Sequence, residues 1–204
     1  NWNGLSLPWM TYGYGVNMTP LQILTFYNAI ANEGEVVKPK FIHSTRKFGT
    51  NDNKIYPKQI LNKSIFSINT NKVLKKMLYD VVHHKNGTAK NIKSKHLKLS
   101  GKTGTAQVDY AKDSINYISS FVGYFPSDEP KYSCIIVINK PNKTKGYYGN
   151  TVAAPVFKRI AEKIFSKYPK VEKYNLHELN KNIKLSKIQI KNRSNLNKIV
   201  SNGT

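Results

Sequence analysis

The apolar positions of this chain follow a helical period in three stretches and a strand period in several others. The first helical stretch begins at Thr19, which can cap a helix, and at Pro20, whose missing N–H costs nothing at the first helical position. It ends at Gly34, a residue typical of helix C-termini. The preceding residues 2–19 are rich in glycine and aromatic side chains, and we expect loops and turns there.

Two further helices are predicted downstream. One is capped by Ser67, Asn69 or Thr70 and ends in the Asn86-Gly87 turn, and the other spans about residues 152–166. In each, the apolar side chains share one stripe that can face a core. The stripes are Val73, Leu74, Met77, Leu78, Val81 and Val82 in the first, and Val156, Phe157, Ile160, Ala161, Ile164 and Phe165 in the second.

Strand candidates follow in a regular order. Residues 36–42 predict a short edge strand, because Pro39 keeps it away from a sheet centre, and the polar residues 43–63 predict a surface loop or hairpin. Residues 99–108, 119–124 and 132–138 predict three neighbouring antiparallel strands with the last helix packed across them. This order predicts an α+β fold, an antiparallel sheet with helices packed on its faces, and excludes a parallel βαβ repeat.

The charge of the chain is strongly positive, with 33 Lys and Arg against 11 Asp and Glu and a net charge of +22. Binding to nucleic acid would explain such an excess, and it predicts a charged stripe with exposed aromatic residues. The lysines are instead scattered from Lys38 to Lys198, and most Tyr and Phe occupy apolar positions of the predicted elements. We therefore favour biased residue usage and no nucleic-acid partner, and leave the question open for the residues after Tyr168.

Domain organisation follows from a change of composition after Pro169. Residues 1–168 predict one domain, and residues 169–204, rich in Lys, Asn and Ser, predict a basic linker or an incomplete second module. The sequence contains no run of about 18 apolar residues, so an anchor of the parent protein is expected upstream of Asn1. Cys134 is the single cysteine and lies beside the apolar residues 135–138, which predicts a buried structural thiol.

Chemistry is concentrated in the stretch Ser100 to Gln107. In an acyl-transfer enzyme the lysine of a Lys-Thr-Gly triplet supplies a fixed positive charge for a substrate carboxylate and for proton relay, and the threonine hydroxyl donates to the same carboxylate. The glycine lets substrate backbone lie against the strand, and an N–H just beyond it can point at a developing oxyanion. The triplet belongs, with Ser-x-x-Lys and Ser-Asp-Asn, to the signatures of β-lactamases and penicillin-binding proteins.

Six blocks of the sequence extend this signature. Residues 13–22, Gly-Tyr-Gly-Val-Asn-Met-Thr-Pro-Leu-Gln, resemble a stretch of class B penicillin-binding transpeptidases. The other blocks follow in the family's order: residues 26–34, 87–89, 102–107, 120–126 and 153–157. The resemblance covers nearly all of residues 1–168. Gly13-Tyr14-Gly15 is more similar to the division-specific, septal branch than to the elongation branch, where Gln often replaces the tyrosine.

The resemblance implies the C-terminal part of a transpeptidase domain of the penicillin-binding-protein and serine β-lactamase-like fold. It implies that Lys102 and Thr103 line the acyl-donor cleft and that Gly104 keeps the strand open. The Thr105 N–H would be one of two oxyanion-hole donors. The resemblance thus implies that the four residues 102–105 are catalytic. Lys102, Thr103 and Thr105 would also bind substrate, with Gln107 at the border of the cleft. Residues 169–204 would be a linker or an incomplete PASTA-like tail.

The resemblance also implies a reaction for the parent protein. A serine attacks the D-Ala-D-Ala end of a peptidoglycan stem peptide, releases D-Ala, and passes the acyl group to an amine of a neighbouring strand. β-Lactams would acylate the same serine, and a membrane-embedded glycan polymerase of the division machinery would be a partner in cell-wall synthesis, cell division and cell shape. No cofactor or metal is implied. The site would face the periplasm or outer side of the plasma membrane, on an anchor outside this chain.

The nucleophile segment is the part of the signature that we do not find. Ser44-Thr45-Arg46-Lys47 matches Ser-x-x-Lys, but it follows a strand and predicts solvated surface, whereas a nucleophilic serine must sit rigidly beside its lysine at the head of a helix. Ser67-Ile68-Asn69 matches Ser-x-Asn, but Ser67 is placed as a helix cap. We therefore expect this chain alone to be inactive, as a fragment or a remnant, and its start at Asn1 favours a fragment.

Two alternatives to a transpeptidase remain. A serine β-lactamase or a β-lactam sensor domain shares the Lys-Thr-Gly strand, although residues 13–22 and 153–157 argue against both. A basic nucleic-acid-binding module is the alternative of another class, and the positions of the aromatic residues disfavour it.

Overall fold

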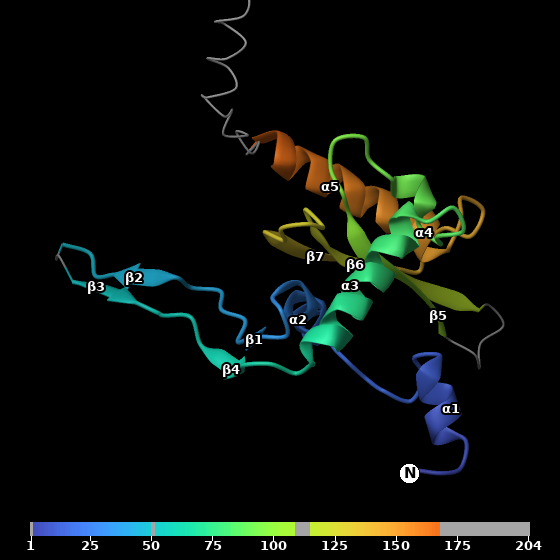
Figure 1. Cartoon of the computed structure of the whole chain (residues 1–204), viewed down its shortest axis with the longest axis horizontal. Helices are drawn as coiled ribbons and strands as arrows, with labels where there is room; N and C mark the ends of the chain where they lie inside the picture. The colour runs from blue at the N-terminus through green and yellow to red at the C-terminus, as the bar shows by residue number, and fades with distance from the viewer. Residues whose placement is uncertain (1, 50–51, 109–114, 168–204) are drawn as a thin grey trace, which may run out of the picture. The chain divides into compact units, whose positions relative to one another are not determined.

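The computed structural model of the chain describes residues 2–49, 52–108 and 115–167 (Figure 1). Residues 1–164 form one compact unit, and residues 165–204 form a second, of which residues 165–167 are described. The domain boundary that the sequence places at residue 168 lies at the limit of the described residues, and it stays a prediction.

A three-stranded antiparallel sheet organises the first unit. It consists of β5 (Ser100–Val108), β6 (Asn116–Phe125) and β7 (Tyr132–Asn139), in the order β5-β6-β7. The register places Gly104 of β5 opposite Ser120 of β6, and Val122 of β6 opposite Ile135 of β7. The prediction of three neighbouring antiparallel strands is therefore confirmed, and β6 is longer than its predicted range.

Helices cover both faces of this sheet. Tyr124 of β6 packs with Ile30 of α2 (Pro20–Ala31) and Leu78 of α3 (Ile68–His83). Its neighbour Phe125 contacts the ring of Phe157 in α5 (Ala154–Lys167), with ring centroids 5.6 Å apart. Because successive strand residues point to opposite faces, α2 and α3 lie on one face and α5 on the other. The α+β class is confirmed.

The helix starts follow the sequence closely. Thr19 and Gln22 form a capping box at the start of α2, and the Ser67 hydroxyl accepts a hydrogen bond from the Thr70 N–H (3.1 Å) at the start of α3. The apolar stripe of α3 is narrower than predicted, since Val73 and Met77 are exposed. The row that faces the sheet contains Leu78 and Val82, so positions 73 and 77 turn away from it.

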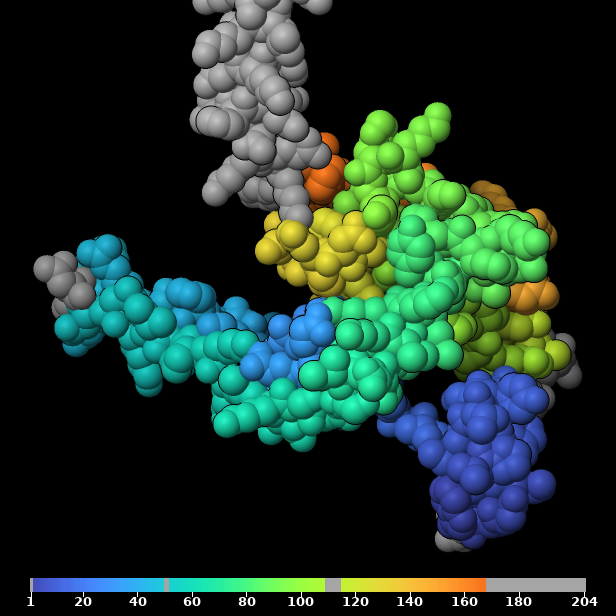
Figure 2. All heavy atoms as spheres, viewed as in Figure 1, coloured from blue at the N-terminus to red at the C-terminus, as the bar shows by residue number. Residues whose placement is uncertain are grey.

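The segment before α2 differs from the prediction of loops and turns. Residues Ser6–Thr11 form a short helix, α1, whose first turn is closed by a hydrogen bond from the Ser6 N–H to the Asn3 carbonyl (3.0 Å). The large apolar side chains of this segment are exposed, and in Figure 2 it forms a projection on the face shown. The turn-forming Asn3 and Ser6 thus outweigh the surrounding Gly and aromatic residues.

Residues 36–62 form two small ladders. β1 (Val36–Val37) pairs with β4 (Ile60–Asn62), and β2 (Ser44–Arg46) pairs with β3 (Asn53–Ile55). The strand predicted at residues 36–42 is therefore confined to its first two residues. The loop or hairpin predicted for residues 43–63 is a hairpin over β2 and β3, whereas β4 in the same range pairs with β1.

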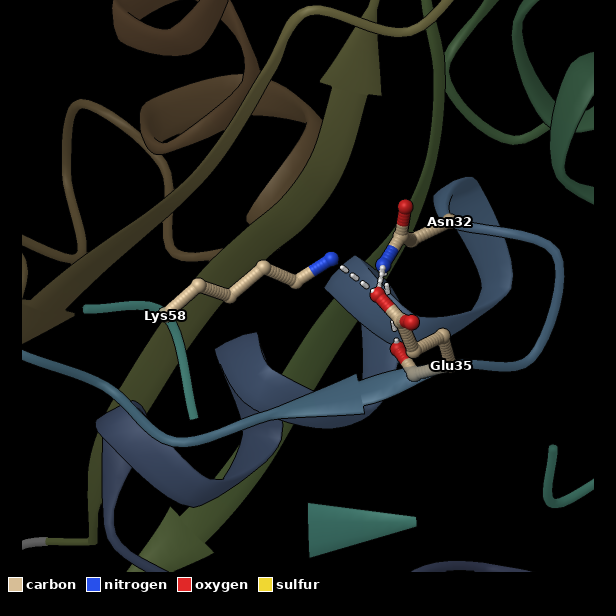
Figure 3. Close-up of polar contacts among 3 residues, drawn as sticks. All are labelled: Asn32, Glu35 and Lys58. Atoms are coloured by element: carbon tan, nitrogen blue, oxygen red, sulfur yellow. Dashed lines mark hydrogen bonds and ion pairs between the residues drawn. The ribbon is translucent and has the colours of Figure 1, made fainter. Parts of the chain in front are cut away.

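A polar contact joins the end of this hairpin to the end of α2. Lys58 forms an ion pair with Glu35, and the Asn32 side-chain amide donates to the same carboxylate (2.9 Å), as Figure 3 shows. Both contacts favour the charged carboxylate, and they lower the pKa of Glu35. The Lys58 side chain is exposed, so the ion pair contributes little to the stability of the fold.

Two further predictions concern individual features. Cys134 on β7 is half-buried rather than buried, and its partial burial raises the pKa of the thiol. Along the ranges that the structure describes, none of the helices has the length and apolar character needed to cross a membrane.

Candidate functional site

The Lys-Thr-Gly triplet lies on β5, at one edge of the described sheet (Figure 1). An edge strand leaves alternate backbone N–H and C=O groups available to a further strand. Lys102 is exposed, and its ammonium group donates to the Thr103 carbonyl (2.9 Å). Because strand residues alternate, Lys102 and Gly104 share one face of β5, and Thr103, Thr105 and Gln107 share the other.

Thr103 has a hydroxyl neighbour from the block 87–89, a contact that the sequence does not predict. The Thr88 and Thr103 hydroxyl oxygens lie 3.4 Å apart. Thr88 is brought there by Gly87, where a Cβ would meet the Val81 carbonyl oxygen at 2.4 Å, and by the hydrogen bond from the Ala89 N–H to the same oxygen (2.9 Å). Residues 87–89 thus fold back on the end of α3 and place a hydroxyl beside the candidate site.

Gly104 is constrained by its cross-strand partner. A Cβ added at Gly104 would lie 2.5 Å from the Ser120 hydroxyl oxygen, which is closer than packed atoms approach. The sequence predicts that Gly104 keeps the strand open for substrate. The structure adds that a side chain here would require the Ser120 hydroxyl to rotate away from β5.

Thr105 uses its side chain as well as its backbone. Its hydroxyl oxygen accepts a hydrogen bond from the Gly149 N–H (3.0 Å), at the start of α4 (Gly149–Val152). The cross-strand partner Ser119 donates its hydroxyl to the Tyr147 carbonyl. Residues 147–149 were not predicted to belong to the site, and they are bonded to β5 through Gly149 and to β6 through Tyr147.

Gln107 lies opposite Tyr117, at the edge of an aromatic cluster. The ring of Tyr147 stacks on Tyr117 with centroids 4.1 Å apart and lies 4.4 Å from that of Tyr148. The Tyr147 hydroxyl donates to the Tyr148 hydroxyl (3.1 Å), and this contact raises the pKa of Tyr148. The run Gly146-Tyr147-Tyr148-Gly149 was the signal in the sequence that could have found this cluster.

The rejected Ser-x-x-Lys and Ser-x-Asn matches lie where the sequence predicts. Ser44 and Lys47 are exposed on the β2–β3 hairpin, which Figure 1 draws away from β5, and Ser67 is the N-cap of α3. A second match to Ser-x-Asn, at residues 114–116, was not among the predicted candidates, and its serine lies outside the described residues.

A metal centre finds no support in the described ranges, where no three His, Cys, Asp or Glu side chains come together. His83 and His84 do point to different surroundings. The His83 ring lies 3.1 Å from the Leu99 carbonyl oxygen, and its partial burial lowers the pKa, whereas His84 is the C-cap of α3.

Comparison with known proteins identifies the family. The model of the penicillin binding protein transpeptidase domain matches residues 1–162. The chain belongs to this family. It is 35% identical over 167 residues to the peptidoglycan D,D-transpeptidase FtsI of Buchnera aphidicola subsp. Baizongia pistaciae, covering 80% of this chain and 27% of that relative. It is 30% identical over 178 residues to the penicillin-binding protein PbpB of Mycolicibacterium smegmatis, covering 82% of this chain and 27% of PbpB.

Solved structures agree with this assignment. Penicillin-binding protein 3 of Mycobacterium tuberculosis, in its apo form, superposes with a TM-score of 0.70 at 28% identity, over 81% of this chain and 39% of that one. Structures of the same protein complexed with aztreonam and with ampicillin also match. The penicillin-binding transpeptidase fold and the class B family, both expected from the sequence, are therefore confirmed. The chain spans about a quarter of the length of the curated relatives it matches.

Proposed function

We propose that this chain is the C-terminal part of a peptidoglycan D,D-transpeptidase that forms a serine acyl-enzyme. The observation that carries the proposal is Lys102-Thr103-Gly104-Thr105 on an edge strand of the family's fold. The relatives named as D,D-transpeptidases support this reaction. The acyl donor would be a stem peptide ending in D-Ala-D-Ala, and no cofactor takes part.

The geometry of β5 suits a substrate that arrives as an extended chain. Such a peptide can pair with the free edge of β5, so that main-chain hydrogen bonds hold it in register. Lys102 then supplies positive charge and Thr103 a hydroxyl donor for the terminal carboxylate. The Thr105 N–H stabilises the oxyanion that forms when the serine attacks, since a fixed donor costs no reorganisation during the reaction. Gln107 borders the substrate on the Thr105 face.

β-Lactams would enter the same cleft and acylate the same serine. The matching structures complexed with aztreonam and ampicillin support this part of the proposal. The FtsI name of several relatives supports a role in septal cell-wall synthesis and cell division, with a membrane-embedded glycan polymerase as partner. The catalytic domain would then lie on the periplasmic side of the plasma membrane, held by an anchor in the parent protein.

Labelling with a fluorescent penicillin tests the proposal. Residues 1–204 alone are expected to show no label that survives denaturation, because no Ser-x-x-Lys serine lies beside Lys102, and a non-covalent half-site binds weakly. The full-length parent is expected to label. Lys102→Ala in that parent is expected to slow labelling by about 100-fold, because charge stabilisation of the transition state is lost.

Lys54→Ala is the matched control, since it removes an exposed lysine from another strand, β3, and is expected to leave labelling unchanged. A stable adduct on the 204-residue chain, mapped by mass spectrometry to any serine, would overturn the proposal. Rapid release of hydrolysed penicillin by the parent would instead indicate a β-lactamase.

A further inference from the structure

Two hydroxyl groups of one cross-strand pair hold the two ends of the 147–149 segment. Thr105 of β5 and Ser119 of β6 lie directly opposite each other. The Thr105 hydroxyl oxygen accepts from the Gly149 N–H (3.0 Å), and the Ser119 hydroxyl donates to the Tyr147 carbonyl. A segment of three residues is thus bonded at its first carbonyl and its last N–H to the same rung of the sheet.

The segment also touches the backbone of β5 at the candidate site. A Cβ at Gly149 would lie 2.6 Å from the Gly104 carbonyl oxygen and 2.4 Å from the Ser120 carbonyl oxygen. Gly149 is buried, and the Ser119 side chain is fully buried, so the contact excludes water. The 147–149 segment therefore supports the strand from one face, at the peptide unit that joins Gly104 to Thr105.

We propose that the Thr105 and Ser119 hydroxyls form a clamp, which holds the 147–149 segment against β5 and so positions the Thr105 N–H. The clamp itself consists of two hydrogen bonds and does not depend on the proposed function. Its effect on catalysis rests on the proposed function. The Thr105 side chain is a positioning group in this view, distinct from the backbone N–H that would touch the oxyanion.

The physical reason lies in the edge position of β5. An edge strand is held by a neighbour on one side only, so contacts on its faces decide where its backbone sits. An oxyanion donor works only within a narrow range of about 2.7–3.1 Å from the developing charge. A displacement of about 1 Å can reduce the rate by about 100-fold. A displaced 147–149 segment would therefore weaken stabilisation of the transition state by the Thr105 N–H more than it weakens substrate binding.

Hydrogen exchange of the Gly149 amide in the 204-residue chain tests the clamp itself. Thr105→Val removes the acceptor and keeps the shape, so we expect exchange at Gly149 to accelerate by about 10-fold or more. Thr105→Ser keeps a hydroxyl and is expected to restore slow exchange. Thr45→Val, the same change on the exposed strand β2, is expected to have no effect. Unchanged exchange at Gly149 in Thr105→Val would overturn the clamp.

Ser119→Ala provides a second variant if Thr105→Val does not fold, and it is expected to accelerate exchange at Gly149 as well. Normal exchange in a folded Ser119→Ala chain would overturn the two-hydroxyl clamp.

Acylation kinetics of the full-length parent test the consequence. Thr105→Val is expected to lower the rate of the acylation step by about 10-fold with little change in the affinity for penicillin, and Thr105→Ser is expected to recover the rate. Weaker binding with an unchanged acylation rate would overturn the positioning role. If the unmodified parent is not labelled by penicillin at all, the proposed function is wrong. Hydrogen exchange of the Gly149 amide then still tests the clamp by itself.

Discussion

Gly149 packs so closely against the backbone of β5 and β6 that it leaves no room for a side chain. The atoms that a Cβ would meet there are backbone carbonyl oxygens of Gly104 and Ser120, which cannot move aside as a side chain can. We expect Gly149→Ala to lower the free energy of unfolding by about 1–3 kcal/mol, because a methyl group must be forced into a packed contact. Urea unfolding followed by circular dichroism measures the difference.

Gly4→Ala is the control for this substitution. Nothing lies within 4 Å of a Cβ built at Gly4, so the same change is expected to shift the free energy of unfolding by less than about 0.5 kcal/mol. Equal effects at both positions would contradict the close contact at Gly149.

Glu33 predicts a pH dependence of stability. Its carboxylate pairs with Lys75 and accepts from the Asn71 side-chain amide (3.1 Å), and the hydrogen bond from Lys75 is the main cause that lowers the pKa of Glu33. A folded-state pKa below the ordinary value of 4.5 means that this stabilisation is complete above that value and is lost as the pH falls through the folded pKa.

The corresponding experiment compares urea unfolding at about pH 6.5 and about pH 3. Because Glu33 is largely exposed, we expect Glu33→Gln to reduce the acid loss of stability by less than about 1 kcal/mol. An identical acid loss in the variant and the original chain would show that the pair contributes nothing. A larger acid loss in the variant would reverse the predicted sign.

At the scale of elements, Ser67 matches a catalytic pattern in the sequence but serves as the N-cap of α3 in the structure. Its hydroxyl accepts from the Thr70 N–H at the start of α3, which satisfies a helix donor that would otherwise lack a partner. Ser67→Ala is expected to lower the free energy of unfolding by about 1 kcal/mol, whereas Ser67→Asp keeps an acceptor and is expected to lose little. Equal losses in both variants would rule out the cap.

Ser44→Ala is the matched control, because Ser44 is an exposed serine on β2 and not at a helix start. We expect a change within about 0.5 kcal/mol. In the full-length parent, neither Ser44→Ala nor Ser67→Ala is expected to abolish penicillin labelling. Loss of labelling in a folded Ser44→Ala variant would show that the rejection of Ser44-Thr45-Arg46-Lys47 is wrong.

The elements also show what local patterning can and cannot predict. The caps of α2 and α3 and the three strands of the sheet follow from residues that are neighbours in the sequence, and they are as predicted. The exposed positions Val73 and Met77 are not, because which part of an apolar stripe is buried depends on the partner that packs on it. The helix α1 was not predicted, because the turn at Asn3 and Ser6 that precedes it is a short local signal within a segment rich in Gly and aromatic residues.

At the scale of the whole molecule, Phe157 joins α5 to the sheet. Its fully buried ring contacts Phe121 and Phe125, with centroids 4.8 Å and 5.6 Å away. Phe157→Ala removes the centre of this contact and leaves a cavity, so we expect a loss of about 3–5 kcal/mol in the free energy of unfolding. Phe48→Ala, at a fully exposed ring, is the control and is expected to change stability little. A small loss at Phe157 would contradict the packing of α5 on β6.

The candidate site was accessible from the sequence because its chemistry is contiguous. Lys102, Thr103, Gly104, Thr105 and Gln107 lie within six residues, and a strand places them along one edge by its geometry alone. Their catalytic roles remain predictions. The sequence marks Thr88 only as part of the block 87–89 and Ser119 only as part of a strand, and it gives no signal that Gly149 reaches β5, because these contacts depend on how distant segments pack.

The sequence by itself determined the helix or strand period of the apolar positions, the helix caps and the family. The first two depend on residues close together in the chain, and the family follows from the order of the six sequence blocks. Tertiary structure alone decided which residues surround the Lys-Thr-Gly strand. The hydrogen bond from the Gly149 N–H to the Thr105 hydroxyl joins residues 44 positions apart, and the same residue approaches Gly104. Such contacts arise when the sheet and α4 pack together, and the free energy that selects them belongs to the assembled core rather than to any local segment.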